Sequence, residues 1–264
     1  MVGSVIGIML AAALAQAPLA QVHFERGQAL FDEHDDTGEA LALAALEFRQ
    51  ALALEPRLAA AVAYLGLIAA EDGHSAEAES DYRKALEMDP KCAEARVGLA
   101  WLHLRAARNR EAIGELRRAV ADRPEHRMAR RELASALTQE NSKPTAEMWR
   151  EAVESWQTLV GLDGNDRDAH HALAKAYEQA GRWGEAERHY REVLRIGQTP
   201  EDSDVWVYSV HTNAAEMCEK QGKWGEAMRE YEALIESEGA GAEEVHHARL
   251  RIERLRLVLP KGSR

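Results

Sequence analysis

A proline that returns at a fixed interval is the feature that most constrains how this chain can fold. Pro56, Pro90 and Pro124 are separated by 34 residues in each case (90 − 56 and 124 − 90). Because proline lacks an N–H and disfavours helical backbone in the residue before it, a helix should end near each proline. The preceding segments place small or apolar residues at i, i+4, i+7 and i+8, the stripe of an amphipathic helix: Ala44, Phe48, Ala51 and Leu52; Ala78, Tyr82, Ala85 and Leu86; Ala112, Leu116, Ala119 and Val120. The chain is therefore predicted to repeat a helical unit of 34 residues.

Composition supports a helical protein and argues against several functional classes. Of the 264 residues, 46% are hydrophobic and 30% charged, and Ala, the strongest helix former, is abundant. The net charge of −12 repels polyphosphate, which argues against general nucleic-acid binding. Cys92 and Cys218 are far apart and have no CxxC or Cys/His ligand spacing. We therefore expect two buried thiols rather than a disulfide framework or a metal site.

The repeated unit resembles the tetratricopeptide repeat, a 34-residue pair of antiparallel helices. The clearest match is residues 167–200, through Leu173, Ala174, Tyr177, Gly181, Trp183, Ala186, Tyr190 and Leu194. Residues 222–227 (GKWGEA) nearly repeat residues 181–186 (GRWGEA). The resemblance implies an all-α, right-handed α-solenoid of about six helix pairs over residues 25–240. The implied units are 25–58, 59–92, 93–126, 127–166, 167–200 and 201–240.

Three of these units depart from the regular pattern. The unit 201–240 has a longer first helix, because Gly222 follows Gly181 by 41 rather than 34 residues (222 − 181). In residues 25–58, Asp32 occupies the place that a small residue takes in the first helix of the other units. In residues 127–166, Asn141–Glu147 lengthens the connection between the helices and Gly164 replaces the proline. The irregularity of residues 127–166 predicts that the solenoid unfolds first in its centre, where hydrogen exchange should be fastest.

After the repeats, residues 241–260 are predicted to form a capping helix. Its apolar residues recur at intervals of three and four and form one seam: Val245, Ala248, Ile252, Leu255 and Leu259. Such a helix would cover the apolar end of the last repeat, which has no further repeat to pack against. Because the remaining faces are rich in Arg, a membrane-surface role is the alternative.

The N-terminal segment differs in character from the rest. Val5–Ala15 is an unbroken apolar run, shorter than the roughly 20 residues that span a bilayer. Small-x-small cleavage patterns follow at residues 13–15 and 15–17, although no Lys or Arg lies near Met1. We therefore predict that residues 1–20 are a signal peptide and that the protein is exported, to a periplasm or outside the cell. The alternative is a cytoplasmic protein in which this segment is a helix ahead of the first repeat.

Motifs of catalysis are missing from the sequence, which contains no GxGxxG, GxxxxGK[ST], GxSxG or HExxH. The 11 His residues are scattered, and we expect most of them to be solvated. The adjacent pair His170 and His171 would point about 100° apart on a helix, which is unfavourable for binding one ion. Residues 163–166 (DGND) lack the order of a calcium loop. The sequence thus predicts no enzyme activity, no cofactor and no metal.

In the tetratricopeptide repeat family, fixed positions of the first helices line the concave face that binds partners. Those positions, with the neighbouring Arg residues, imply these partner-binding residues: Ala63, Leu67, Val97, Trp101, Leu104, Arg105, Arg131 and Ser135. Exposed apolar surface that includes Trp and Arg often marks a binding site. Alternatively, the curvature of the solenoid or the N-terminal segment covers these positions. The Lys and Asn clamp with which some members bind a C-terminal carboxylate has no counterpart at the matching places.

Charge is also unevenly distributed along the chain. Residues 25–55 carry eight acidic residues against two Arg, a net of −6, and residues 105–131 carry nine Arg against four acidic residues, a net of +5. Pairing within the protein is one explanation of this Arg belt, and docking of an acidic partner is the other.

Together these features predict a non-enzymatic scaffold. It would bind a partner helix or peptide with apolar anchors and acidic flanks in the concave groove, without nucleic acid and without a membrane span. The alternative is a regulatory or assembly subunit of a larger enzyme or cell-envelope complex.

Overall fold

The described part of the chain consists of α-helices joined by turns. The computed structural model describes residues 18–32, 38–139, 144–197, 204–236 and 241–258, and it has no strand within those ranges. The predicted all-α solenoid of helix pairs is thereby confirmed. None of the described helices is long and apolar enough to cross a membrane. Residues 1–17, with most of the predicted signal peptide 1–20, lie outside the described ranges, so its cleavage stays a prediction.

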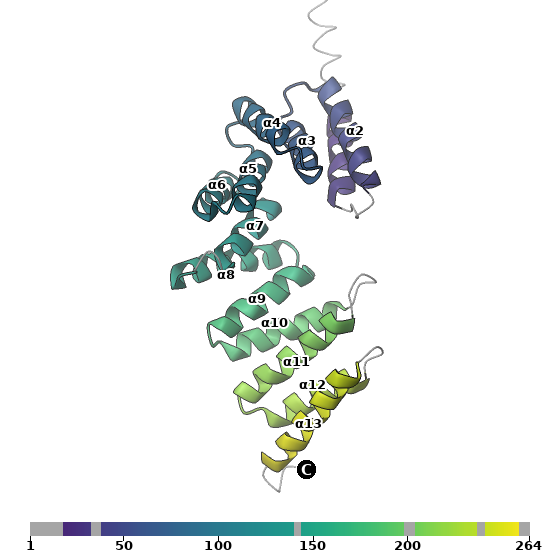
Figure 1. Ribbon diagram of the computed structural model, residues 1–264, viewed down its shortest axis with the longest axis vertical. Helices are drawn as coiled ribbons and strands as arrows, with labels where there is room; N and C mark the ends of the chain where they lie inside the picture. The colour runs from purple at the N-terminus through teal and green to yellow at the C-terminus, as the bar shows by residue number, and fades with distance from the viewer. Residues whose placement is uncertain (1–17, 33–37, 140–143, 198–203, 237–240, 259–264) are drawn as a thin grey trace, which may run out of the picture. The chain divides into compact units, whose positions relative to one another are not determined.

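The chain divides into two compact units, and the first ends at Pro144. A helix over residues 18–32 precedes six further helices (Figure 1). These are α2 (Glu39–Leu54), α3 (Ala59–Glu71), α4 (Ser75–Met88), α5 (Ala93–Arg105), α6 (Asn109–Asp122) and α7 (Arg127–Thr138). Helices α3 and α4 form one pair and α5 and α6 the next, and α5 contacts both α3 and α7, the first helices of the neighbouring repeats. This arrangement is the one predicted for residues 59–126.

The second unit begins at Thr145. Its helices are α8 (Ala146–Leu162), α9 (Arg167–Gln179), α10 (Trp183–Ile196), α11 (Asp204–Lys220), α12 (Trp224–Glu236) and α13 (Ala242–Val258). Helix α9 pairs with α10 and α11 pairs with α12, and α10 packs on α11. The predicted unit 127–166 is divided, because α7 belongs to the first unit and α8 to the second. Part of its lengthened connection, residues 140–143, lies outside the described ranges.

Glycines allow the helices of the first unit to approach closely. A Cβ atom on Gly66 or on Gly98 would lie only 2.8 or 2.2 Å from the ring of Tyr82. The same relation holds between Gly27 and Phe48, where the distance would be 2.7 Å. Gly27 therefore fills the small-residue place that the sequence assigned to Asp32.

The first repeat accordingly begins earlier than predicted. Its first helix covers residues 18–32, whereas the predicted unit starts at residue 25. Residues 33–38 separate this helix from α2, but only residues 72–74 separate α3 from α4. The prediction counted back 34 residues from the next repeat and so placed the small residue of the first helix at position 32. Because the connection in this repeat is longer, the small residue is at position 27, and the predicted register was wrong by five residues (32 − 27).

The predicted capping helix is α13. It buries Ala248, Ile252 and Leu255 in a cluster with Tyr231 and Leu234 of α12. Val245 is partly buried, and Leu259 lies outside the described ranges. The seam read from the sequence thus packs on the last repeat, as expected for a helix that closes a solenoid.

Candidate functional site

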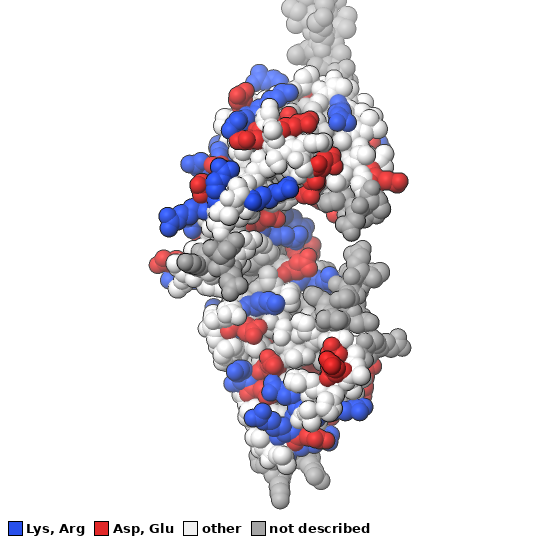
Figure 2. Space-filling model, in the orientation of Figure 1, with Lys and Arg blue, Asp and Glu red and all other residues white. Residues whose placement is uncertain are grey.

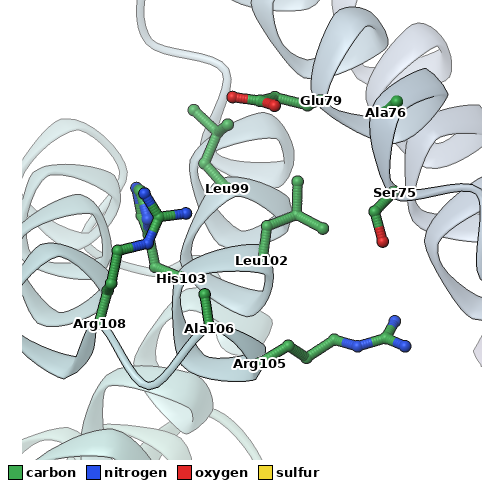
Figure 3. Close-up of a pocket in the computed structure, with 9 residues that line it drawn as sticks. All are labelled: Ser75, Ala76, Glu79, Leu99, Leu102, His103, Arg105, Ala106 and Arg108. Atoms are coloured by element: carbon green, nitrogen blue, oxygen red, sulfur yellow. The ribbon is translucent and has the colours of Figure 1, made fainter.

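Two pockets of the first unit meet at the C-terminal end of α5. One has a volume of about 330 Å³ and is lined by Ala70, Glu71, Trp101, Leu102, Leu104 and Arg105. The other, of about 400 Å³, is lined by Ser75, Ala76, Glu79, Leu99, Leu102, His103, Arg105, Ala106 and Arg108. Figure 3 shows the second pocket, in which side chains from the end of α5 face the first turns of α4. The two pockets share one apolar side chain, Leu102, and one cationic side chain, Arg105.

Arg105 is held in place at one side of its guanidinium group. Its Nη1 donates a hydrogen bond of 2.9 Å to the carbonyl oxygen of Ala70, in the last turn of α3. A cation at this position also complements the negative end of the helix dipole. The side chain is exposed, and guanidinium has five N–H donors. The donors that do not bond to Ala70 can therefore bind a carboxylate from solution.

Trp101 forms a half-buried wall of the smaller pocket. Its indole N–H donates a hydrogen bond to the carboxylate of Glu132 in α7. Burial raises the pKa of Glu132 above its usual value, although the hydrogen bond from Trp101 and the charge of Arg131 act to lower it. Because the indole N–H is already bonded to Glu132, Trp101 offers a partner its apolar ring surface.

Three predicted site residues are buried, which corrects the expectation of an open apolar floor. Ala63, Leu67 and Val97 each have 0% relative exposure. Ala63 and Leu67 belong to a cluster that includes Phe24 and Phe31 of the helix over residues 18–32. A helix that is apolar on all sides is normally buried, and α3 has no charged residue before Glu71. The alternative in which these positions are covered is therefore the correct one for all three.

The other predicted residues divide into two groups. Trp101, Leu104 and Arg105 line the pocket beside the end of α3. Arg131 and Ser135, in α7, are partly exposed but do not line it. Ala70, Glu71 and Leu102 also line this pocket, and of these Glu71 and Leu102 were not predicted. Ala70 stands at a fixed family position, but only the packing of α3 against α5 shows that these three side chains share a pocket.

The second unit contains a further pocket, which the sequence did not predict. It has a volume of about 410 Å³ and is lined by Ala146, Trp149, Arg150, Val153, Glu154, Gln157, Ala176, Tyr177, Gln179, Ala180 and Arg182. Tyr177 is central to it, because its hydroxyl accepts a hydrogen bond of 2.6 Å from Gln157 and its ring lies 4.6 Å below the guanidinium carbon of Arg182. This pocket is similar in volume to the larger pocket at the end of α5 and therefore offers a matched control for it.

One group of side chains has the geometry of a metal site. Ligand atoms of Glu187 in α10, Cys218 in α11 and Glu226 in α12 all lie within 4.8 Å of one another. Cations of the protein itself already occupy the space. Arg191 pairs with Glu187 and lies 2.9 Å from Glu226 and 3.6 Å from the Cys218 sulfur, and Lys223 lies 2.8 Å from Glu187.

The chemistry of the thiol agrees with a structural role for this group. Burial, reinforced by the charge of Glu187, raises the pKa of Cys218 to about 12, so the thiolate that a metal prefers does not form near neutral pH. We interpret the group as an ion-pair network that joins α10, α11 and α12.

Much of the Arg belt is engaged within the protein. Arg118 lies 2.8 Å from Glu115, and Arg123 lies 3.0 Å from Asp89 of the preceding repeat. Figure 2 shows Lys and Arg side chains gathered over α6, with acidic side chains between them. Pairing within the protein therefore accounts for part of the belt. Docking of an acidic partner on the rest stays a prediction.

Comparison with known proteins agrees with the helix pairs. Family models of the tetratricopeptide repeat match residues 69–139 and residues 169–203. No curated protein sequence matches the chain significantly.

Several solved structures share the fold. YrrB, described as a TPR protein with an unusual peptide-binding site, superposes with a TM-score of 0.58 at 18% identity, over 76% of this chain and 97% of its own. PilF of Pseudomonas aeruginosa gives 0.56 at 17% identity, over 94% and 98%. PilW, described as a type IV pilus biogenesis factor, gives 0.56 at 17% identity, over 87% and 97%. Repeat models on two separate segments, together with the helix pairs of both units, show that the chain contains tetratricopeptide repeats.

Proposed function

We propose that the protein is a non-enzymatic interaction scaffold that binds a segment of a partner protein at the end of α5. The observation that carries this proposal is that Trp101, Leu104 and Arg105 line one pocket. They combine an aromatic ring, an aliphatic side chain and a cation within two turns of one helix. Trp and Arg are the residues that most often contribute the binding energy of an interface.

The pocket suits a short anchor rather than a whole helix. Volumes of about 330 and 400 Å³ lie at the lower end of the range for ligand pockets, roughly 300–1,000 Å³. An apolar side chain of the partner would lie against Trp101 and Leu104. A neighbouring Asp or Glu would accept hydrogen bonds from the N–H groups of Arg105, whose planar geometry matches a carboxylate.

The comparisons support this mode of action at the level of the fold. YrrB, whose structure superposes on 76% of this chain, is described as having a peptide-binding site. Because the identity is 18%, the shared feature is the architecture of stacked helices, and the chemistry of the pocket rests on this chain's own residues.

A selection from a random peptide library, followed by affinity measurement on the selected peptides, tests the proposal. We expect peptides with an apolar residue close to Asp or Glu. Arg105→Gln should weaken their binding about tenfold, which corresponds to about 1.4 kcal/mol, and the difference should shrink as salt is added. Leu104→Asp should remove binding, because it places a charge where the apolar anchor would lie.

Arg150→Gln is the matched control, since Arg150 is an exposed Arg that lines the pocket of the second unit. It should leave affinity unchanged. If the selected peptides bind both α5 variants as tightly as the wild type, the pocket at α5 is not the site. Trp101→Ala is less informative, because it also leaves Glu132 without its hydrogen bond.

The second candidate is an assembly subunit of a cell-envelope complex. It is favoured by the extent of the similarity to PilF and PilW, which covers 94% and 87% of this chain. The two functions differ in how the partner is held. An assembly subunit should co-purify with a stoichiometric partner through gel filtration at dilute protein, whereas a peptide-binding scaffold should lose its exchangeable partner.

A further inference from the structure

Helix α13, yellow in Figure 1, carries apolar side chains on two opposite faces. One face packs on α12 through Ala248, Ile252 and Leu255. On the opposite side, Leu250 is 50% exposed and Leu257 is 87% exposed. Leu250 and Leu257 are seven residues apart and therefore lie on one stripe of the helix. A helix that only capped the solenoid would carry polar residues on this outer stripe.

Two charged residues lie between these leucines on the same outer face. Glu253 and Arg254 follow Leu250 by three and four residues, which places them beside it on the helix surface. Both are exposed, and neither has a hydrogen bond or ion pair with any residue that the structure describes. Arg251, on the flank toward α12, is instead 3.1 Å from the Tyr231 hydroxyl and 3.3 Å from Glu216.

The outer stripe is complementary to itself when two copies run antiparallel. It reads Leu-x-x-Glu-Arg-x-x-Leu over residues 250–257. A twofold axis between Glu253 and Arg254 places Leu250 opposite Leu257 of a second copy, and Glu253 opposite Arg254 of that copy. Each contact then occurs twice, as a twofold interface requires. A parallel arrangement would instead place Glu253 against Glu253 and Arg254 against Arg254, which is repulsive.

We propose that α13 pairs antiparallel with α13 of a second copy of this chain, so that the protein forms a twofold dimer through its C-terminal helix. A second copy fits this face because the stripe, read in reverse, places each leucine opposite a leucine and each acidic residue opposite a basic one. A contact of one helix on each side is small, so the dimer should dissociate on dilution. This inference is independent of the proposed pocket, which lies in the other unit.

Charge argues against an anionic membrane as the occupant. The chain has a net charge of −12, and Glu243, Glu244 and Glu253 belong to α13 itself. An amphipathic helix that binds anionic lipid normally carries basic residues along its polar face. The acidic residues of α13 would face the lipid headgroups together with its arginines.

Sedimentation velocity of the full chain over a hundredfold range of concentration tests the proposal. The wild type should shift from monomer to dimer. Glu253→Arg and Arg254→Glu should each raise the dimer dissociation constant at least tenfold, because each places like charges opposite each other. The double variant, Glu253→Arg with Arg254→Glu, should dimerise again, because the reversed pair is complementary to itself.

A mixture of the two single variants provides the sharpest result. One chain then has two arginines at the centre of the stripe and the other has two glutamates, so the mixture should form heterodimers although neither variant dimerises alone. Leu257→Asp should also prevent dimerisation. Leu46→Asp in α2 is the control, because Leu46 is a 49% exposed leucine in the other unit, and it should leave the dissociation constant unchanged.

Circular dichroism of each variant verifies that it is folded. Folding is expected because the substituted residues, Leu46, Glu253, Arg254 and Leu257, are all exposed. A wild type that stays monomeric at every concentration overturns the proposal. So does a dimer that survives both single charge reversals, or a mixture of the two variants that remains monomeric. Binding of the wild type to vesicles of anionic lipid, without self-association, would show that the outer face of α13 contacts a membrane instead.

Discussion

At the scale of single residues, a pair of histidines, one buried and one partly buried, departs from the expectation that most histidines are solvated. His170 is buried, and its Nδ1 lies 3.0 Å from Nδ1 of His189. A hydrogen bond between two ring nitrogens requires one of them to accept, so at least one ring is neutral. Burial, and next the charge of His170, lower the pKa of His189 to about 4. Its ring also stacks on Tyr177, with ring centroids 5.5 Å apart.

This pair predicts a loss of stability in mild acid. Between pH of about 6.5 and about 4, the unfolded chain binds a proton at His189 and the folded chain does not. The free energy of unfolding should therefore fall as pH decreases through this window. His189→Phe keeps the stacking surface and removes the titrating group, so its stability should depend less steeply on pH. Urea unfolding at several pH values measures both slopes.

His247→Phe is the control for this measurement, since His247 is exposed on α13. It should leave the slope of the wild type unchanged. Equal slopes for the wild type and His189→Phe would contradict this prediction, because they would show that His189 binds its proton over the same pH range in the folded and the unfolded chain.

At the scale of helices, contact between aromatic rings and glycines sets how closely the repeats stack. Gly98 of α5 lies against Tyr82 of α4, and an added Cβ would be 2.2 Å from the ring. Gly114 of α6 has nothing within 4 Å of the position its Cβ would take. The two glycines are both in helices, so only their surroundings differ.

We therefore expect opposite effects from the same substitution. Gly98→Ala should destabilise the protein by about 1–3 kcal/mol, because the Tyr82 ring or the helix must move. Gly114→Ala should stabilise it by up to about 1 kcal/mol, because Ala has the higher helix propensity. Chemical denaturation measures the two changes in free energy. If Gly98→Ala were stabilising, α4 and α5 would be farther apart than the contact between Gly98 and Tyr82 implies.

At the scale of the whole molecule, the chain consists of two units, each with its own core. One buried cluster joins the helix over residues 18–32 to α2, α3, α4 and α5. Another joins α11, α12 and α13. The division falls between Pro144 and Thr145, where Thr145 caps α8 by accepting a hydrogen bond from the Met148 N–H. A cut at this point leaves that cap intact.

Two fragments that end at Pro144 and begin at Thr145 should therefore each fold. Circular dichroism should show helix in both, and each should unfold cooperatively on heating. A cut after Gly197 is the control, because it separates Glu187 from Lys223 and Arg191 from Glu226. The two fragments of that cut should together contain less helix than the intact chain. Unfolded fragments from the first cut would show that the two units depend on each other.

Local sequence was sufficient to predict the helix pairs. Helices α2, α4 and α6 end at Leu54, Met88 and Asp122, each two residues before a repeated proline. The capping helix was also predictable, since one apolar seam is a property of a single helix. These features depend on residues that are close in the chain, so spacing alone reveals them.

Tertiary structure alone decided which of the apolar positions are exposed. Leu67 and Val97 have the spacing of groove residues but are buried, whereas Trp101 and Leu104 line a pocket. Burial depends on neighbours that come from other repeats, as the contact of Arg105 with Ala70 across 35 residues illustrates. The start of the first repeat was likewise not predictable, because the number of residues between its two helices changes the register without changing the packing of Gly27 on Phe48. Sequence thus determined the helices and their order, and the packing between repeats determined the surface that remains for a partner.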